Sequence, residues 1–164
     1  MTLVTRYTRF RLNPVLVAVL LAIVVGGLGG AATDIGPWYR ALIKPSWQPP
    51  DWLFGPVWTT IYVLTAIAGV YAWRRGNAAD RRRFALALAL NLVLNVMWSV
   101  IFFTLKRPDL ALLEVVPLWL SIALLIVLVK RYSPLSAVLM LPYLLWVGFA
   151  TYLNWTIVRL NGLL

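Results

Sequence analysis

The sequence predicts an all-α fold, an integral membrane bundle of five transmembrane helices. Of its 164 residues, 62% are apolar and only 12% are charged, which leaves too little polar surface to cover a soluble domain of this size. The apolar residues gather in five runs of about 20, the length that a helix needs to cross roughly 30 Å of hydrocarbon. Little chain is left over, so we expect a single transmembrane domain over residues 1–164.

The five apolar runs place the expected helices at about residues 14–33, 53–73, 84–104, 110–129 and 134–158. Short basic connections join the last four, so consecutive helices are expected to pack as antiparallel neighbours. A signal peptide is the alternative interpretation of the first run, because a basic start and the small residues Gly29-Gly30-Ala31-Ala32 imitate one. Its apolar stretch is, however, longer than an ordinary signal core.

Basic residues lie in short clusters at the ends of the runs. The N-terminal side carries ten of the fifteen Lys and Arg residues, namely Arg6, Arg9, Arg11, Arg74, Arg75, Arg81, Arg82, Arg83, Lys130 and Arg131. By the positive-inside rule, the chain is a multi-pass membrane protein with a cytoplasmic N-terminus, in a membrane that the sequence does not identify. The net charge of +10 then indicates contact with membrane lipid and not with nucleic acid.

The one long connection, residues 34–52, predicts a stiff lid over one end of the bundle. It is rich in aromatic and proline residues, and proline lowers the entropy lost when a segment becomes ordered. An aromatic belt at the membrane interface is the alternative, and it would account for Trp47 and Trp52. The residues expected at the lid and the mouth beneath it are Trp38, Arg40, Lys44, Pro45 and Trp47.

Three helices carry a face of aromatic and amide side chains. In the third helix, Asn91, Asn95, Trp98 and Phe102 recur at steps of four, three and four, which places them on one face. Amides at membrane depth are costly in lipid, so this face is expected to point into the bundle. Comparable faces follow Trp58, Tyr62, Thr65 and Gly69 in the second helix and Tyr143, Trp146, Ala150, Leu153 and Asn154 in the fifth. They indicate a cavity for a flat, largely apolar ligand; ordinary helix packing held by Asn side chains is the alternative.

Glu114 is the one acid well inside an apolar run, three residues before Pro117. A carboxylate at membrane depth is a functional candidate. The alternative is that Glu114 lies near the helix end and meets a backbone amide or Lys106.

The chain contains neither Cys nor His. Thiol nucleophiles, His general bases and the usual ligands of zinc and haem iron are therefore excluded. We expect no catalytic residue, no metal site and no resident cofactor.

Three strings resemble the TspO/translocator-protein family of tryptophan-rich sensory proteins and peripheral benzodiazepine receptors. They are WYRALIKPSWQPPDWLFGPVWTTIY, NLVLNVMWSVIFFTLKR and PYLLWVGFATYLNWTIVRLN, and the resemblance spans essentially the whole chain. It implies a five-helix bundle whose pocket lies under the loop between the first two helices. Carried over by position, the pocket residues are Tyr39, Trp58, Asn91, Asn95, Trp98, Trp146 and Ala150, with Tyr62 on the same face.

The resemblance also implies a ligand class and a dimer. Tetrapyrroles such as porphyrins are the first expected partner and sterol-like molecules the second, because Trp155 stands where animal members have the Tyr of their cholesterol motif. The porphyrin carboxylates are expected to meet Arg40 or Lys44. A homodimer is expected through Ala85 and Ala89 of the third helix, with the first-helix stripe Ala22, Gly26 and Gly30 as the alternative.

The resemblance therefore predicts a membrane receptor, carrier or sensor for porphyrins and possible sterol ligands. Two alternatives stay open. One is a light- and oxygen-dependent degradation of porphyrin, in which the pigment and oxygen supply the reactivity. The other is a stress-regulatory scaffold that acts through partner proteins.

Overall fold

The computed structural model describes residues 13–163 and confirms an all-α membrane bundle. The long helices are α1 (Pro14–Ala32), α3 (Asp51–Arg75), α4 (Ala78–Ser99), α5 (Pro108–Val129) and α6 (Pro134–Leu160), and a short helix α2 (Pro37–Ala41) lies between α1 and α3. With its π-helical extension, α4 reaches Thr104, and within residues 13–163 five helices are long and apolar enough to cross a membrane. The chain is an integral, multi-pass membrane protein.

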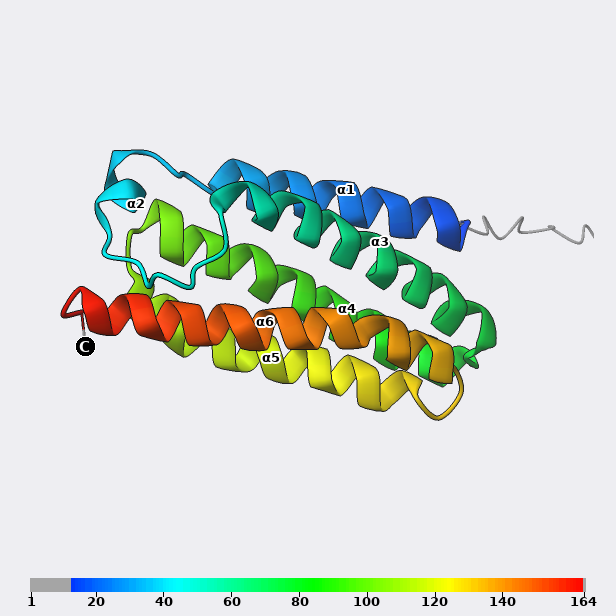
Figure 1. The fold of residues 1–164 in the computed structure, drawn as a ribbon. Helices are drawn as coiled ribbons and strands as arrows, with labels where there is room; N and C mark the ends of the chain where they lie inside the picture. Colours follow the sequence, from blue (N-terminus) through cyan, green and yellow to red (C-terminus); the bar gives the residue numbers. More distant parts are fainter. Residues whose placement is uncertain (1–12, 164) are drawn as a thin grey trace, which may run out of the picture.

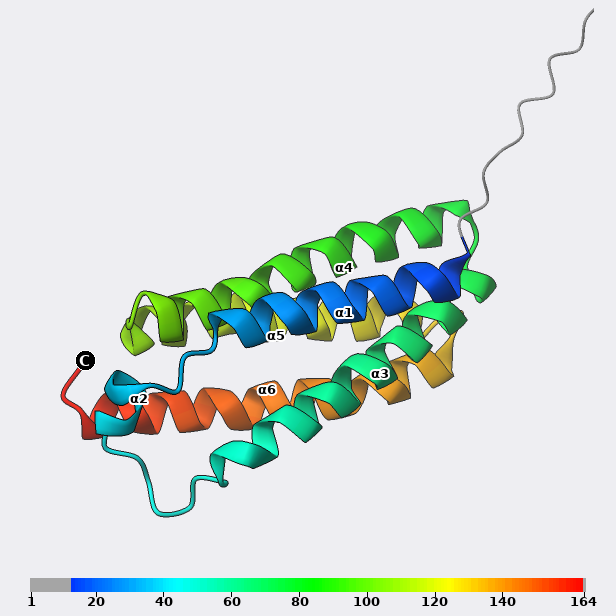
Figure 2. The ribbon, with the colours of Figure 1, turned by 90° about the horizontal axis from the view of Figure 1, so that it is seen from above.

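The long helices form a ring in the order α1, α3, α6, α5, α4. The expectation that all consecutive helices pack as neighbours is wrong for α3 and α4, because α1 lies between them (Figure 2). The lid and the C-terminal end of α6 lie at one end of the bundle, and the α3–α4 and α5–α6 turns lie at the other (Figure 1). The expected basic residues Arg6, Arg9 and Arg11 lie outside the described residues.

Most helices extend by a few residues beyond the apolar runs, whereas α1 ends at Ala32, one residue before the predicted end. Helix α4 starts at Ala78 and not at Phe84, because Asn77 and Asp80 form a capping box. Helix α3 likewise runs on to Arg75, and α6 to Leu160. Arginine is a good helix former, so a helix can continue from an apolar run into basic residues. Hydropathy therefore marks the apolar middle of each helix and not its ends.

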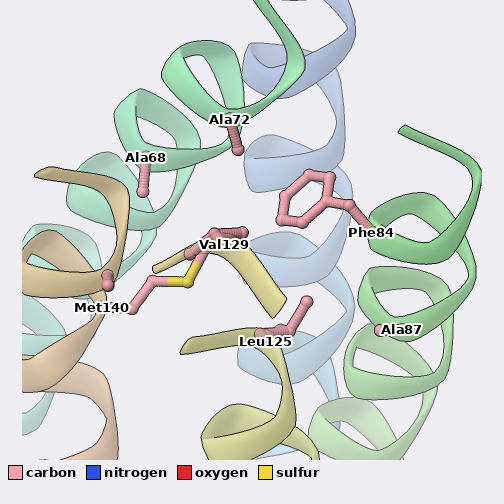
Figure 3. Close-up of a cluster of buried hydrophobic side chains, with 8 residues drawn as sticks. Ala68, Ala72, Phe84, Ala87, Leu125, Val129 and Met140 are labelled. Atoms are coloured by element: carbon pink, nitrogen blue, oxygen red, sulfur yellow. The ribbon is translucent and has the colours of Figure 1, made fainter. Parts of the chain in front are cut away.

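The end of the bundle away from the lid is closely packed. Small residues Ala68 and Ala72 of α3 and Ala137 of α6 let the helices approach, and the ring of Phe84 fills the space that remains (Figure 3). Ser136 fastens this end, since its hydroxyl donates to the backbone carbonyl of Ala68 over 2.8 Å. Among the described residues this end of the bundle is filled by packed side chains, and the cavity described below lies toward the lid.

Helix α4 ends in a π-helical turn, η1 (Val100–Thr104), which the apolar pattern did not predict. Its wide turn is closed by the Leu105 amide, which donates to the Val100 carbonyl over 2.9 Å. Such turns alter the faces that successive side chains present and are frequent at functional sites. Here both Phe102 and Phe103 reach the same cavity.

The lid is fastened to the end of α6. The Asn161 side chain accepts from the Ile43 amide over 3.0 Å and donates to the Ile43 carbonyl over 2.9 Å. Trp47 stacks on Tyr152 with ring centroids 5.1 Å apart. These contacts support the lid interpretation for the loop, whereas Trp52, 71% exposed, fits the aromatic belt.

The outer surface is apolar, as a lipid-facing surface requires. Ala85 and Ala89 lie exposed on α4, beside the exposed Leu86 and Leu90. In the first-helix alternative, Gly26 faces the bundle, where an added Cβ would lie 3.4 Å from the Tyr62 ring, whereas Gly30 is exposed. The homodimer through α4 stays a prediction.

Candidate functional site

A cavity of about 390 Å³ lies beneath the lid among the five long helices, and α5 contributes Val115 and Leu118 to its lining. This volume falls within the range of about 300–1,000 Å³ typical of small-molecule sites. Eight aromatic side chains line it, and they come from α3, from α4 with η1, from α6 and from the lid: Tyr39, Phe54, Trp58, Tyr62, Trp98, Phe102, Phe103 and Trp146. The cavity suits a flat, largely apolar molecule that stacks on ring faces.

Most of the predicted ligand-binding residues meet at this cavity. Seven of the eight line it: Tyr39, Trp58, Tyr62, Asn95, Trp98, Trp146 and Ala150. Trp58 stacks on Tyr62 with ring centroids 5.5 Å apart, so the two form one continuous wall of α3. Whether these residues bind a ligand stays a prediction.

Asn91 is the exception, because it lies one turn deeper and supports the wall from behind. Its amide donates to the Ser121 hydroxyl of α5 over 2.8 Å and accepts a longer bond, 3.4 Å, from the Tyr143 hydroxyl of α6. Asn95 continues this network toward the cavity, since it donates to Tyr143 over 2.9 Å and accepts from Tyr62 over 3.1 Å. The two amides therefore join α3, α4, α5 and α6 at membrane depth.

The predicted lid residues lie around the cavity and not in its lining. Trp38 packs edge-on against Phe102, with centroids 6.1 Å apart. The Arg40 guanidinium donates to the Ile35 carbonyl over 3.2 Å, and the Lys44 ammonium lies 3.9 Å from the centroid of the Tyr39 ring. Neither Pro45 nor Trp47 borders the cavity. In this structure Arg40 and Lys44 therefore do not form the cationic mouth that the loop sequence suggested.

The charged group at the mouth is instead an acid, Asp51, on the first turn of α3. Its Oδ1 accepts from the Tyr39 hydroxyl and from the Gln48 amide, each over 3.1 Å. Burial and the neighbouring Asp51 charge raise the pKa of Tyr39 to about 12. Tyr39 thus keeps its proton at neutral pH and holds the lid to α3.

The chain matches the family model described as TspO/MBR family over residues 18–160. The protein belongs to the TspO/MBR family. Similar proteins include Tryptophan-rich protein TspO of Chlorobaculum tepidum, 40% identical over 147 residues that cover 86% of this chain and 91% of the relative. Translocator protein of Homo sapiens is 36% identical over 126 residues, covering 76% of this chain and 75% of the relative. Tryptophan-rich sensory protein of Cereibacter sphaeroides is 34% identical over 132 residues, covering 80% and 82%.

In this TspO/MBR member, two tryptophans of the cavity wall have an unpaired indole N–H. Within residues 13–163, neither Trp98 Nε1 nor Trp146 Nε1 has an acceptor. A buried donor without a partner is costly.

The first helix contributes a part of the wall that sequence reasoning missed. Gly26, Gly29 and Gly30 all line the cavity, and the absence of side chains lets Tyr62 approach α1. The spacing of these glycines did indicate a close approach. It could not show whether the approaching group was an aromatic ring or a second copy of the chain.

Glu114 of this TspO/MBR member lies beside the cavity and not in it. Its side chain is only 7% exposed, and among the described residues neither carboxyl oxygen has a hydrogen-bond partner. The alternative interpretation, a contact with a backbone amide or Lys106, is therefore not made in this structure. Asn154 of α6 instead reaches the start of α5. Its side-chain nitrogen donates to the Pro108 carbonyl and its side-chain oxygen accepts from the Leu112 amide, each over 3.1 Å.

Proposed function

We propose that this protein is a membrane receptor or carrier that binds a flat polycyclic ligand, a tetrapyrrole first and a sterol second, in the cavity beneath the lid. The observation that carries the proposal is the lidded aromatic cavity itself, which seven predicted residues line. A planar macrocycle gains stacking area on each ring face that it covers. Relatives named as a translocator and as a sensory protein agree with a role in moving or sensing a ligand.

The proposed macrocycle is metal-free. Haem iron is usually held by His, Cys, Met or Tyr, and the chain has neither His nor Cys. Tyr39 and Tyr62 line the cavity, but their hydroxyls donate to Asp51 and Asn95. Met140 is buried in the closely packed cluster away from the lid, where no ligand reaches it. A porphyrin is therefore held by its faces and edges, and its centre needs no bond from the protein.

Sterols rank second because the side chains near the C-terminal end of α6 that would contact one already contact other groups. The Arg159 guanidinium lies 4.9 Å from the centroid of the Trp155 ring. Tyr152, the nearest tyrosine along α6, stacks on Trp47 of the lid. Arg159 and Tyr152, the residues nearest to such a motif, are thus committed to other contacts.

Replacing Trp146 or Trp98 by phenylalanine tests the proposal. Each change keeps an aromatic ring but removes stacking area and an N–H donor, so we expect affinity for protoporphyrin to fall roughly two- to tenfold. Quenching of intrinsic fluorescence during porphyrin titration in detergent measures it. Trp155→Phe is the matched control, because Trp155 lies on α6 but does not line the cavity, and its affinity should equal that of the wild type. If all three variants bind protoporphyrin as tightly as the wild type, the cavity is not the binding site.

A further inference from the structure

The cavity reaches the molecular surface at one place, between the end of α1 and the start of α3. Most of its lining residues are buried or half-buried, and the exposed ones are Gly30, Thr33, Ile35, Asp51 and Gly55. They come from the last turn of α1, the beginning of the lid and the first two turns of α3. Among the described residues of α4, α5 and α6, none is an exposed part of the lining. The gap that these residues border, the side opening, therefore lies at the side of the bundle below the lid.

Glycines and the course of the helices give the side opening its width. An added Cβ on Gly26 would lie 3.4 Å from the Tyr62 ring, so α1 and α3 are in close contact at that level. One turn closer to the lid, an added Cβ on Gly30 would meet no atom within 4 Å, and the same holds for Gly55 of α3. Figure 2 shows the two helices diverging toward the lid. The side opening thus begins above Tyr62 and widens toward the lid.

The side opening lies near the level where the membrane meets water. Gly30 is in the last turn of α1 and Gly55 is in the second turn of α3. Trp52, in the first turn of α3, is 71% exposed, and tryptophans are enriched at the membrane–water interface. Leu28 of α1 is exposed as well, as contact with lipid requires. A flat apolar molecule dissolved in the membrane therefore meets the side opening without first crossing water.

A route past the lid would break several hydrogen bonds. Tyr39 and Gln48 of the lid both donate to Asp51, and Asn161 makes two hydrogen bonds with the backbone of Ile43. Lifting the lid separates these partners. Within residues 13–163, in contrast, no hydrogen bond joins α1 to α3. The side opening can therefore widen without the loss of a hydrogen bond between the two helices.

We propose that the side opening is the entrance of the cavity, through which the ligand passes between α1 and α3 from the membrane interface while the lid stays closed. The proposal rests on the proposed function, because it concerns the same cavity. Gly30 and Gly55 present only backbone at the entrance, so a flat ring passes edge-first and then meets the aromatic walls. A polar edge that enters last, such as the carboxylates of a porphyrin, stays at the interface, where it avoids the cost of burial.

Trapping of a bound ligand tests the proposal. The chain has no Cys, so Gly55→Cys supplies a single thiol at a position where a Cβ meets no other atom. Protoporphyrin is bound first, and benzyl methanethiosulfonate then attaches a benzyl group to the thiol. We expect dissociation, followed as recovery of intrinsic fluorescence after dilution into empty micelles, to slow about tenfold, which corresponds to a barrier raised by about 1.4 kcal/mol. Removal of the benzyl group by a reducing agent should restore the original rate.

Gly27→Cys with the same benzyl group is the matched control, because Gly27 is an exposed glycine of α1 that does not line the cavity. Its dissociation rate should not change. Asn161→Ala releases Ile43 of the lid and should leave the rates of the unmodified protein unchanged. If the benzyl group on Gly55→Cys leaves dissociation unchanged or makes it faster, or if Asn161→Ala speeds association, the entrance is overturned while the cavity remains the site. If the wild type does not bind protoporphyrin at all, the proposed function fails together with the entrance.

Discussion

The Asn95→Leu variant is expected to lose about 1–3 kcal/mol of stability, because the change removes two hydrogen bonds at membrane depth. Tyr62 then has no acceptor for its hydroxyl, and Tyr143 loses the amide that donates to it over 2.9 Å. Asn95 is only 4% exposed, so bulk water does not surround the groups that lose their partner. The midpoint of thermal unfolding in detergent measures the effect.

A double-mutant cycle with Tyr62→Phe is the control for this prediction. In the Tyr62→Phe background there is no Tyr62 hydroxyl to lose its acceptor. Asn95→Leu should therefore lower the stability less in this background than in the wild type. Strictly additive losses would show that the Tyr62–Asn95 contact contributes nothing to the bundle.

The Gly26→Leu variant is expected to lose roughly tenfold or more in porphyrin affinity, because overpacking of a filled site costs about 1–3 kcal/mol. A Cβ at this position would lie 3.4 Å from the Tyr62 ring. The rest of a leucine side chain must therefore displace that ring or enter the cavity. Fluorescence titration measures the affinity, and helix content by circular dichroism shows that the bundle persists.

Gly27→Leu is the matched control, since it adds the same side chain to the same helix at the next residue. A Cβ on Gly27 would meet no atom within 4 Å, and Gly27 does not line the cavity. Its affinity should remain at the wild-type value. Equal losses in both variants would mean that leucine acts on α1 in general and that the cavity does not extend to Gly26.

Much of the cavity could be predicted from helical spacing, because a face that repeats every three or four residues keeps its direction along a regular helix. That rule placed Asn95 with Trp98 and Trp146 with Ala150, and all four line the cavity. The spacing predicts the direction in which a side chain points, but not how far along the helix the cavity extends. Asn91 shares the face of Asn95, yet it lies beyond the floor of the cavity, where it bonds to Ser121 of α5.

Other features of the cavity and the lid could not be predicted from the sequence, because they do not depend on a regular helical repeat. The π-helical turn brings Phe103 beside Phe102, and a regular helical period does not describe such a turn. The lid has no regular period, so its sequence could not show that Lys44 lies on the Tyr39 ring or that Asp51 borders the cavity. Gly26 has no side chain, and its role depends on Tyr62 of another helix.

An experimental structure of the protein with bound protoporphyrin tests the central claim most directly, since it locates the ring. We predict that the ring lies between α1, α3, α4 and α6 beneath Tyr39, in contact with Trp98 and Trp146. The contradicting result is a ring on the outer surface, for instance in the groove between α3 and α6 lined by Pro56, Pro142 and Leu145, with the inner cavity empty.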